Sequence, residues 1–199
     1  HKIALYSLKI LYKLNCINLF FSKIQDKKVE FLGLKFTNRL GTAAGLDKDG
    51  DFIDCLGSLG FGFLEVGTVT PLPQKGNPKP RVFRLFKENA VINRLGFNNK
   101  GVDHLVKRLR TRKYKGIVGV NIGANKDSQD EKRIDDYLQC FKKVCDYANY
   151  ITINISSPNT PGLRDLHTID NIKSLIGPIE REAKIKNFKG PIFLKISPD

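Results

Sequence analysis

The stretch that decides the fold is residues 154–164, which read Asn154-Ile155-Ser156-Ser157-Pro158-Asn159-Thr160-Pro161-Gly162-Leu163-Arg164. It follows a short apolar run, Tyr150 to Ile155, with the length and composition of a buried strand. Each residue before a proline is pushed towards extended backbone, so Ser157 and Thr160 are held extended. A stiff polar loop after a strand is typical of a functional site, because the scaffold fixes its side chains. A simple turn is the alternative, since Ser, Asn and Pro are common turn residues.

Short apolar strands alternate with helices along the whole chain. We expect strands at 40–45, 63–69, 117–122, 151–155 and 192–196, with helices between them near 50–59, 102–109, 131–144 and from about 168. We also expect a β-like segment at 29–36 and a small hairpin at 81–86 and 90–93. Ser128 and Glu131 have capping-box spacing. The last helix is expected to bury Ile169, Ile172, Leu175, Ile176 and Ile179.

These strands lack polar alternation, which is typical of a parallel sheet covered on both faces. Two architectures fit: an open doubly wound sheet and a closed barrel. The sequence contains neither the glycine fingerprint of dinucleotide-binding sheets nor a phosphate-binding P-loop, which favours the barrel. A parallel (β/α)8 TIM barrel typically needs roughly 250 residues. We therefore expect an incomplete barrel with about five of its eight strands in these 199 residues.

Residues 2–21 have the spacing of an amphipathic helix, with apolar side chains at Ile3, Tyr6, Ile10, Leu14, Ile17 and Phe21, and with Leu8 and Leu11 widening the apolar stripe. Lysines interrupt the segment, so it is too polar to span a bilayer, which takes about 20 predominantly apolar residues. It could lie in a membrane interface or pack on the protein body, and periodicity leaves both open. No cleavage-type site follows, so it is not a secretory signal.

Composition describes an ordinary soluble domain, with 41% hydrophobic and 27% charged residues. The net charge of +14 would suit nucleic acid, an anionic membrane or an anionic substrate, and most of the lysines are expected simply to be solvated. The four cysteines lack metal or redox spacing and are expected to be reduced structural thiols. No methionine occurs, and the sequence stops just after a strand, so we expect truncation at both ends.

Polar side chains follow each expected strand. They are Asp47 and Lys48, Thr68 and Thr70, Asn121, the group Asn154, Ser157 and Asn159, and Lys195. In a barrel the carboxyl ends of the strands form one rim, and this rim carries the active site. Amides both donate and accept hydrogen bonds, so several Asn suit a planar heterocycle. Lysines suit an anionic group, and Gly45 permits close backbone approach. The pattern predicts a large polar ligand at the barrel mouth.

Individual residues also have simpler interpretations. Asp47 beside Lys48 could form a structural ion pair, and His104 and His167 lie away from the strand ends. The acidic residues and histidines show no metal-ligand spacing. Ser157 has no neighbouring His, so a hydrolytic triad is not indicated. A serine above a planar ring could instead accept a proton from carbon, although its free pKa is far from neutral.

Six motifs are spread over essentially the whole chain. They are Ala43-Ala44-Gly45-Leu46-Asp47-Lys48-Asp49-Gly50, Glu65-Val66-Gly67-Thr68-Val69-Thr70-Pro71, Lys79-Pro80-Arg81-Val82-Phe83-Arg84-Leu85, Ile92-Asn93-Arg94-Leu95-Gly96-Phe97-Asn98-Asn99, Asn121-Ile122-Gly123 and residues 154–164. On these motifs the chain resembles the dihydroorotate dehydrogenases, and specifically their class 2, quinone-dependent, bacterial-type branch. The resemblance implies an FMN-containing TIM barrel that oxidises dihydroorotate to orotate in pyrimidine synthesis, with a membrane quinone as final electron acceptor.

The resemblance also implies roles for individual residues. FMN contacts are implied for Ala44, Gly45, Leu46, Asp47, Lys48, Thr68, Asn121, Asn154 and Lys195. Substrate contacts are implied for Lys48, Asn93, Arg94, Leu95, Gly96, Phe97, Asn154 and Asn159. Ser157 matches the catalytic base, where class 1 enzymes carry Cys, and His1 and Arg84 match quinone-site positions.

The N-terminal segment is the second class 2 mark, because it resembles part of a two-helix lid on an anionic membrane surface. The implied division is a membrane-associating, quinone-lid segment at 1–28 and an FMN-binding barrel domain at 29–199. The implied location is the cytoplasmic face of the bacterial inner membrane, with the mitochondrial inner membrane as the alternative. The first lid helix and the last barrel strands of the family pattern are missing from this sequence, so we expect it to be part of a longer protein.

Two other functions remain open from the sequence. One is a flavin barrel that reduces uridines in tRNA, suited by the charge and by the basic residues between 107 and 115. Against this, Ser157 replaces a cysteine acid and the basic run lacks aromatic residues, so nucleic acid is not expected as a partner. The other is a catalytically incompetent, membrane-associated fragment.

Overall fold

The computed structural model describes residues 2–20, 27–157 and 168–197. Its centre is a five-stranded sheet in the order β3-β4-β7-β8-β9, and every neighbouring pair is parallel. The strands are β3 Gly41–Thr42, β4 Phe63–Val69, β7 Ile117–Ile122, β8 Tyr150–Asn154 and β9 Ile192–Lys195. All five predicted strands are therefore present, although β3 is shorter than expected.

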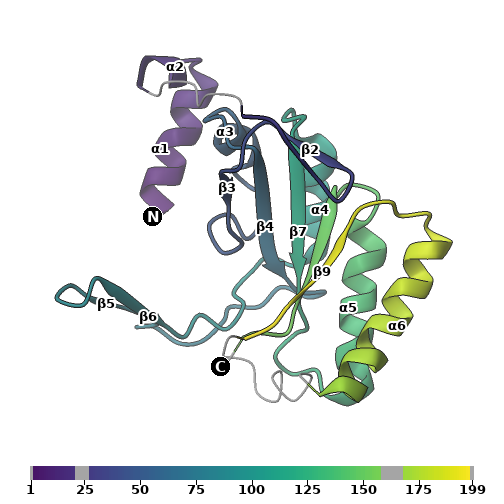
Figure 1. The fold of residues 1–199 in the computed structure, drawn as a ribbon. Helices are drawn as coiled ribbons and strands as arrows, with labels where there is room; N and C mark the ends of the chain where they lie inside the picture. The colour runs from purple at the N-terminus through teal and green to yellow at the C-terminus, as the bar shows by residue number, and fades with distance from the viewer. Residues whose placement is uncertain (1, 21–26, 158–167, 198–199) are drawn as a thin grey trace.

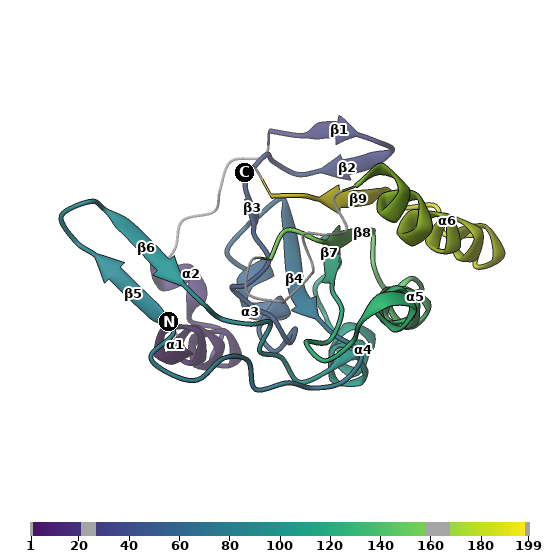
Figure 2. The ribbon, with the colours of Figure 1, turned by 90° about the horizontal axis from the view of Figure 1, so that it is seen from below.

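The helices between the strands lie together outside the curved sheet. They are α3 Ile53–Gly57, α4 Val102–Thr111, α5 Asp130–Val144 and α6 Ile169–Ile185. Figure 2 shows the molecule of Figure 1 from below, and in this view the helices form an arc around the strands. A doubly wound sheet would carry helices on both faces. Sequential strand order with helices on one side is the arrangement of successive β/α units of a barrel, as predicted.

The strands β7 and β8, which have neighbours on both sides, are buried along their whole length, as their mostly apolar sequences predict. Every residue of β7 and β8 is buried. Gly119 of β7 is required by close approach, because a Cβ atom there would lie 2.0 Å from the ring of Tyr150. The missing side chain lets the Tyr150 ring lie across the sheet's inner face.

Each outer helix buries one stripe against the sheet. The buried side chains include Leu105 and Leu109 of α4, Tyr137 and Phe141 of α5, and Leu175 and Ile179 of α6. Thr168 caps α6, where its hydroxyl accepts from the Asn171 amide at 3.4 Å. Ile169, expected inside, is 72% exposed, and it is the first residue of α6.

The predicted capping box before α5 is wrong. The N-cap is Gln129, without a side-chain cap. Ser128 is buried, and its backbone carbonyl accepts from Arg133 Nε and Nη2 at 3.2 and 3.1 Å. The arginine side chain therefore ties down the turn that precedes the helix.

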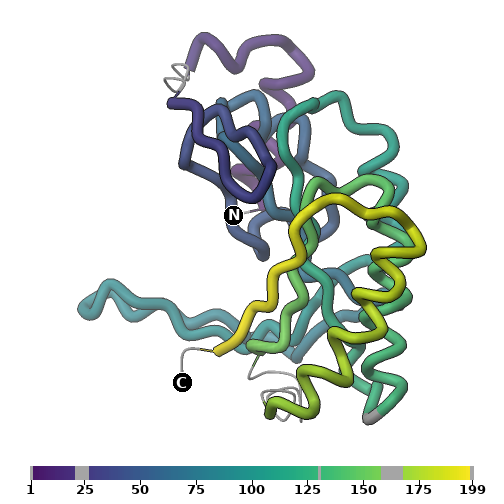
Figure 3. The backbone as a smooth tube through the Cα atoms, turned by 45° about the vertical axis from the view of Figure 1, so that its right-hand side comes forward, coloured from purple at the N-terminus to yellow at the C-terminus, as the bar shows by residue number. Residues whose placement is uncertain are grey.

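Two antiparallel hairpins lie outside the parallel sheet. One joins β1 Val29–Phe31 to β2 Leu34–Phe36, and the other joins β5 Val82–Leu85 to β6 Ala90–Asn93, as predicted. In Figure 1 the β5–β6 hairpin projects sideways from the level where β4 and β7 end. The tube view in Figure 3 shows the same projection.

The N-terminal segment forms α1 Lys2–Lys13 and α2 Ile17–Phe20, separated by Asn15 at a φ of 56°. Leu8 and Ile17 of the predicted stripe are buried, together with Leu5, which the prediction did not include. Ile3 and Ile10 of that stripe are 85% and 58% exposed. Among the described helices, none combines the length and apolarity needed to cross a membrane.

Candidate functional site

Three of the predicted rim side chains meet on the inner face of the sheet. Thr68 Oγ1 donates to Asn121 Oδ1 at 2.6 Å. Asn154 Nδ2 donates to Thr68 Oγ1 at 3.0 Å and to Asn121 Oδ1 at 3.2 Å. All three residues are buried, and they come from the carboxyl-terminal halves of β4, β7 and β8. The predicted convergence of polar groups from successive strands is confirmed for these three residues.

A carboxylate that the sequence analysis missed lies directly beneath them. Glu65 of β4 accepts from Asn121 Nδ2 at 2.9 Å through Oε1. Its Oε2 accepts from the Tyr150 hydroxyl at 3.0 Å and from Thr152 Oγ1 at 3.3 Å. Burial, and then the charge of Glu65, raises the pKa of the Tyr150 phenol, which stays a donor. The available signal was a single carboxylate inside an otherwise apolar strand.

An aromatic layer lies below Glu65, towards the amino ends of the strands. The Phe63 ring contacts Phe36 of the β1–β2 hairpin, with ring centroids 5.5 Å apart. Tyr150 contacts Phe63 and Phe193 edge to face, at 6.5 and 5.5 Å. The inner face is therefore layered: aromatic rings, then a carboxylate, then hydroxyl and amide groups.

Lys195 and Ala44 border the same cavity on the inner face. The cavity has a volume of about 610 Å³, and Glu65 and Thr152 also line it. Lys195 of β9 is in register with Asn154 of β8, so the ammonium group belongs to the same level of the sheet. The cavity combines apolar walls with a few polar groups, a composition typical of small-molecule sites.

Gly45 and Asp47 shape the loop after β3. Gly45 has a φ of +104°, and a Cβ atom there would meet nothing within 4 Å, so a ligand has room to approach the backbone. Asp47 is buried and accepts from the backbone amides of Asp51 and Phe52 at 3.0 and 2.8 Å. Burial raises its pKa to about 6 despite these bonds. These hydrogen bonds indicate that Asp47 fixes the conformation of the loop after β3.

Lys48 and Leu46 face a second cavity, of about 860 Å³. Ile3 and Leu5 of α1 line it from one side, and Leu95 lines it from another. Lys48 Nζ donates to Asn98 Oδ1 at 3.1 Å. Burial, and then the nearby charge of Arg81, lowers the Lys48 pKa to about 8. A buried ammonium next to another cation is a favourable place for an anion, which would offset both effects.

The residues predicted to bind substrate within 93–97 lie in different surroundings. Asn93 and Arg94 are exposed at the end of β6, and both Arg94 Nε and Nη2 donate to Pro80 O. Leu95 lines the 860 Å³ cavity. Gly96 and the buried Phe97 both have positive φ, at 67° and 47°. The structure does not bring Asn93 and Arg94 to the Asn121–Asn154 group.

Ser157 is buried three residues after Asn154. The turn between them is fixed, because Ser156 N and Oγ donate to Asn154 Oδ1 at 3.0 and 2.8 Å. Of the quinone positions, Arg84 is exposed on the β5–β6 hairpin. His1 and Asn159 lie outside the described residues.

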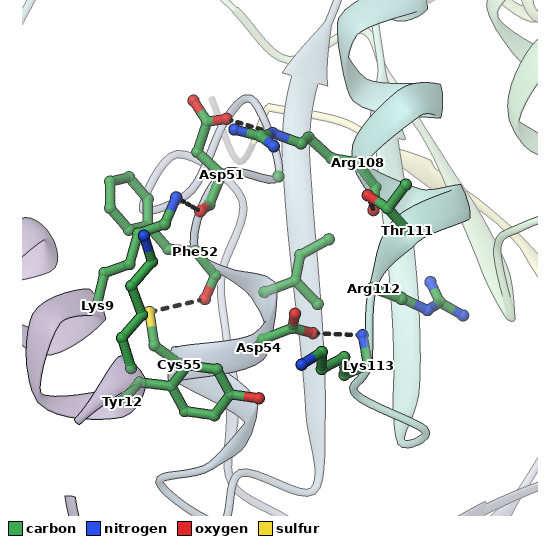
Figure 4. Close-up of a pocket in the computed structure, with 13 residues that line it drawn as sticks. Lys9, Tyr12, Asp51, Phe52, Asp54, Cys55, Arg108, Thr111, Arg112 and Lys113 are labelled. Atoms are coloured by element: carbon green, nitrogen blue, oxygen red, sulfur yellow. Dashed lines mark hydrogen bonds and ion pairs between the residues drawn. The ribbon is translucent and has the colours of Figure 1, made fainter. Parts of the chain in front are cut away.

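A smaller cavity of about 280 Å³ lies on the outer side, between α1, α3 and the end of α4 (Figure 4). Lys9 Nζ donates to Asp51 O at 2.9 Å, and Arg108 Nε donates to Asp51 Oδ1 at 2.7 Å. Burial raises the pKa of the Cys55 thiol to about 11. All four cysteines are unpaired, as predicted, and this region joins α1 to the body of the protein.

Comparisons with known proteins agree on one family. The family model for dihydroorotate dehydrogenase matches residues 27–199. The protein named dihydroorotate dehydrogenase (quinone) from Cellvibrio japonicus is 50% identical over 203 residues, which cover 100% of this chain and 59% of that protein. The protein of the same name from Pseudomonas aeruginosa is 55% identical over 175 residues, 86% of this chain and 51% of that protein.

A solved structure is similar over the same span. The structure of dihydroorotate dehydrogenase from Eimeria tenella, in complex with ferulenol, superposes with a TM-score of 0.86 at 37% identity. The match covers 100% of this chain and 60% of that one. The matches thus cover between 51% and 60% of the length of these relatives, and the five parallel strands of this chain correspond to part of their barrel.

Proposed function

Because this chain belongs to the dihydroorotate dehydrogenase family, we propose that it oxidises dihydroorotate to orotate with FMN and passes the electrons to a membrane quinone. The single observation that carries the proposal is the Thr68–Asn121–Asn154 group on the inner face of the sheet. Relatives at about 50% identity bear the name of the quinone-dependent enzyme. Neither finding favours the tRNA-reducing alternative.

The donor set of the inner face fits a flavin. Among the described residues, Asn121 donates one Nδ2 hydrogen to Glu65 and has no protein acceptor for the other. Lys195 and Ala44 border the adjoining cavity, and Gly45 leaves open space beside the backbone. Amide and ammonium donors at one edge suit the carbonyl oxygens of an isoalloxazine ring. When bound, FMN would accept a hydride from the substrate and later release electrons to the quinone.

The chain's own residues would bind and deprotonate the substrate. Lys48, held in a buried and positively charged setting, would pair with the substrate carboxylate. Ser157 would accept the proton from the ring carbon, since it follows the fixed turn after Asn154. Leu95 and Phe97 would supply apolar walls. We assign Asn93, Arg94 and Asn159 to substrate binding only by their match to the family pattern.

The test is anaerobic reduction of the bound flavin. We expect the FMN-loaded protein to lose its visible absorbance when dihydroorotate is added and to regain it when a soluble quinone follows. Bound FMN that dihydroorotate does not bleach would refute the proposed substrate. Bleaching without recovery by quinone would refute the proposed acceptor.

Replacing the proposed base separates binding from chemistry. Ser157→Ala should retain FMN and lower the rate of flavin reduction by about 10² to 10⁴, the usual contribution of a positioned general base. Ser58→Ala is a matched control, because the Ser58 hydroxyl donates to Cys55 O on the outer side, remote from the rim. A Ser157→Ala variant that reduces flavin as fast as the control would remove Ser157 from this role.

The proposed quinone side is the N-terminal segment. Residues 1–28 would form the lid and 29–199 the FMN-binding domain, with Arg84 and His1 at the quinone. The 860 Å³ cavity lies between α1 and the loop after β3, which supports a passage there. Exposed apolar residues on α1 with nearby lysines suit an anionic membrane surface, so we place the protein peripherally on the cytoplasmic face of the bacterial inner membrane.

A further inference from the structure

We propose that Glu65 is a positioning residue that sets the orientation of the Asn121 side-chain amide, and so decides which of its two ends is presented to the bound flavin. The inference deepens the proposed function and rests on it for the identity of the ligand. Glu65 would act through Asn121, although its own side chain also borders the inner-face cavity. It lies one layer below the rim and contacts Asn121 from beneath.

An Asn amide has two ends of similar shape and opposite polarity, so a neighbour must distinguish them. In the structure, Asn121 Oδ1 faces two donors, Thr68 Oγ1 and Asn154 Nδ2. Asn121 Nδ2 faces the carboxylate of Glu65 at 2.9 Å. Turning the amide over would place its oxygen against the carboxylate and its NH₂ group against the Asn154 NH₂. The reversed state loses these bonds and opposes like partial charges.

The carboxylate is itself held in place by donors alone. Its second oxygen accepts from the Tyr150 hydroxyl at 3.0 Å and from Thr152 Oγ1 at 3.3 Å. Gly119 makes room for the Tyr150 ring, and the ring packs edge to face between Phe63 and Phe193. A group surrounded by three donors matches a carboxylate, which accepts without donating. Glu65 thus has a fixed position from which to act on Asn121.

The rest of the group depends on this choice. Asn154 donates both hydrogens of its amide, to Thr68 and to Asn121, and its oxygen accepts from Ser156 N and Oγ. With Asn121 turned over, Asn154 would lose one acceptor and the turn towards Ser157 would lose part of its support. The effect of Glu65 therefore extends through Asn121 to the segment that carries the proposed base.

The test variant is Glu65→Gln, which keeps the size and can still accept from Asn121 through its amide oxygen. Its NH₂ group can donate to Tyr150 or Thr152, so the fold should survive. Only the charge that distinguishes the two Asn121 orientations is lost. Asp51→Asn is the matched control, because it also removes a carboxylate with three side-chain donors, from the outer side of the protein.

The first readout needs no flavin. Two-dimensional ¹H–¹⁵N spectra of asparagine-labelled protein report the Asn121 NH₂ signals, assigned with Asn121→Ala. We expect them to shift in Glu65→Gln and to exchange with water about tenfold faster or more, since charge-assisted hydrogen bonds are strong. They should not change in Asp51→Asn. Unchanged Asn121 signals in a folded Glu65→Gln protein would overturn the inference.

The second readout is the FMN dissociation constant, measured by flavin fluorescence. We expect Glu65→Gln to weaken FMN binding by about tenfold, and Asp51→Asn to leave it unchanged. Equal weakening by both variants would overturn the inference in favour of general destabilisation. If the unmodified protein binds no FMN while the Asn121 signals respond as expected, the proposed function fails and the positioning role of Glu65 stands.

Discussion

At the scale of single residues, Asp47 and Asp51 show how position decides the behaviour of identical side chains. Asp47 is buried and bonded only by backbone amides, and burial raises its pKa to about 6. Burial also acts on Asp51, but hydrogen bonds from Lys100, Arg108 and His104 outweigh it and lower the pKa well below the usual value. The two carboxylates therefore respond to pH in opposite directions.

Ionisation of Asp47 should lower the free energy of unfolding as the pH rises. Its pKa is about 6 when folded and close to 4 when unfolded, so the folded state binds the proton more tightly. This stabilisation is complete below about pH 4 and is lost as pH rises through 6. From pH 4 to pH 7, we expect wild type to lose about 2–3 kcal/mol relative to Asp47→Asn in urea unfolding. Parallel stability curves for the two proteins would contradict this assignment.

Asp51 should have the opposite effect at lower pH. Its pKa is lowered by folding, so its stabilisation is present above about pH 4 and disappears as pH falls below that value. At pH 7, Asp51→Asn should cost about 1–3 kcal/mol, because three charge-assisted bonds at a partly exposed site are lost. The variant's acid unfolding between pH 4 and 2 should be less steep. A variant as stable as wild type at pH 7 would show that these ion pairs contribute little.

Residue-level prediction succeeded where a side chain follows a strand. Asn121, Asn154 and Thr68 could be placed together because parallel strands bring their carboxyl ends to one edge. Glu65 could not, since it lies within a strand. Whether it faces inward depends on the alignment of β4 with β7, and no local pattern encodes that alignment. The predicted Ser128 cap was wrong for a similar reason. The Arg133 side chain donates a hydrogen bond to the Ser128 carbonyl, and the local sequence pattern does not encode this contact.

At the scale of elements, α1 carries two apolar faces and only one of them is used. Leu5 and Leu8 pack on the protein, and Tyr6 contacts the Phe52 ring at 5.2 Å. Ile3, Ile10 and Leu14 remain exposed. Helical spacing predicted a helix over residues 2–21, whereas α1 ends at Lys13, and both faces of α1 are apolar enough to be the buried one. Only contact with α3 decides between them.

The two faces of α1 should respond differently to substitution. Leu8→Ala should lower the free energy of unfolding by about 2 kcal/mol or more, because it removes a buried side chain. Ile10→Ala should change it by less than about 0.5 kcal/mol, since Ile10 is exposed. If this face meets the membrane, Ile10→Ala should also weaken co-sedimentation with anionic vesicles, whereas Lys35→Ala on β2 should not. Vesicle binding that Ile10→Ala leaves unchanged would argue against a membrane-facing role.

At the scale of the whole molecule, the residues most shielded from solvent lie in the centre of the sheet. β7 and β8 are buried throughout, with strands on both sides. The β5–β6 hairpin is mostly exposed, and two-stranded hairpins are marginally stable alone. The order of strands and helices could be predicted because each strand signal is local. The curvature of the sheet and the projection of the hairpin could not, since they result from packing.

Hydrogen exchange should reproduce this gradient. We expect the slowest amide exchange in β7 and β8, and the fastest in the β5–β6 hairpin and α1, because local opening costs least where little surface is buried. Mass spectrometry of peptic fragments would measure it. Fast exchange across β8 under native conditions would mean that the sheet lacks a stable centre.

The layered inner face has a consequence for assembly. Each of β4, β7, β8 and β9 contributes its group to the face only if the strands are aligned as observed, since a slip of one residue turns every side chain of that strand to the opposite face. A molecule with a slipped strand would keep an apolar interior and lose its polar contacts. A ligand that needs all of these contacts would bind only the correctly aligned form and shift the population towards it. Ligand binding would therefore select molecules whose strands are correctly aligned.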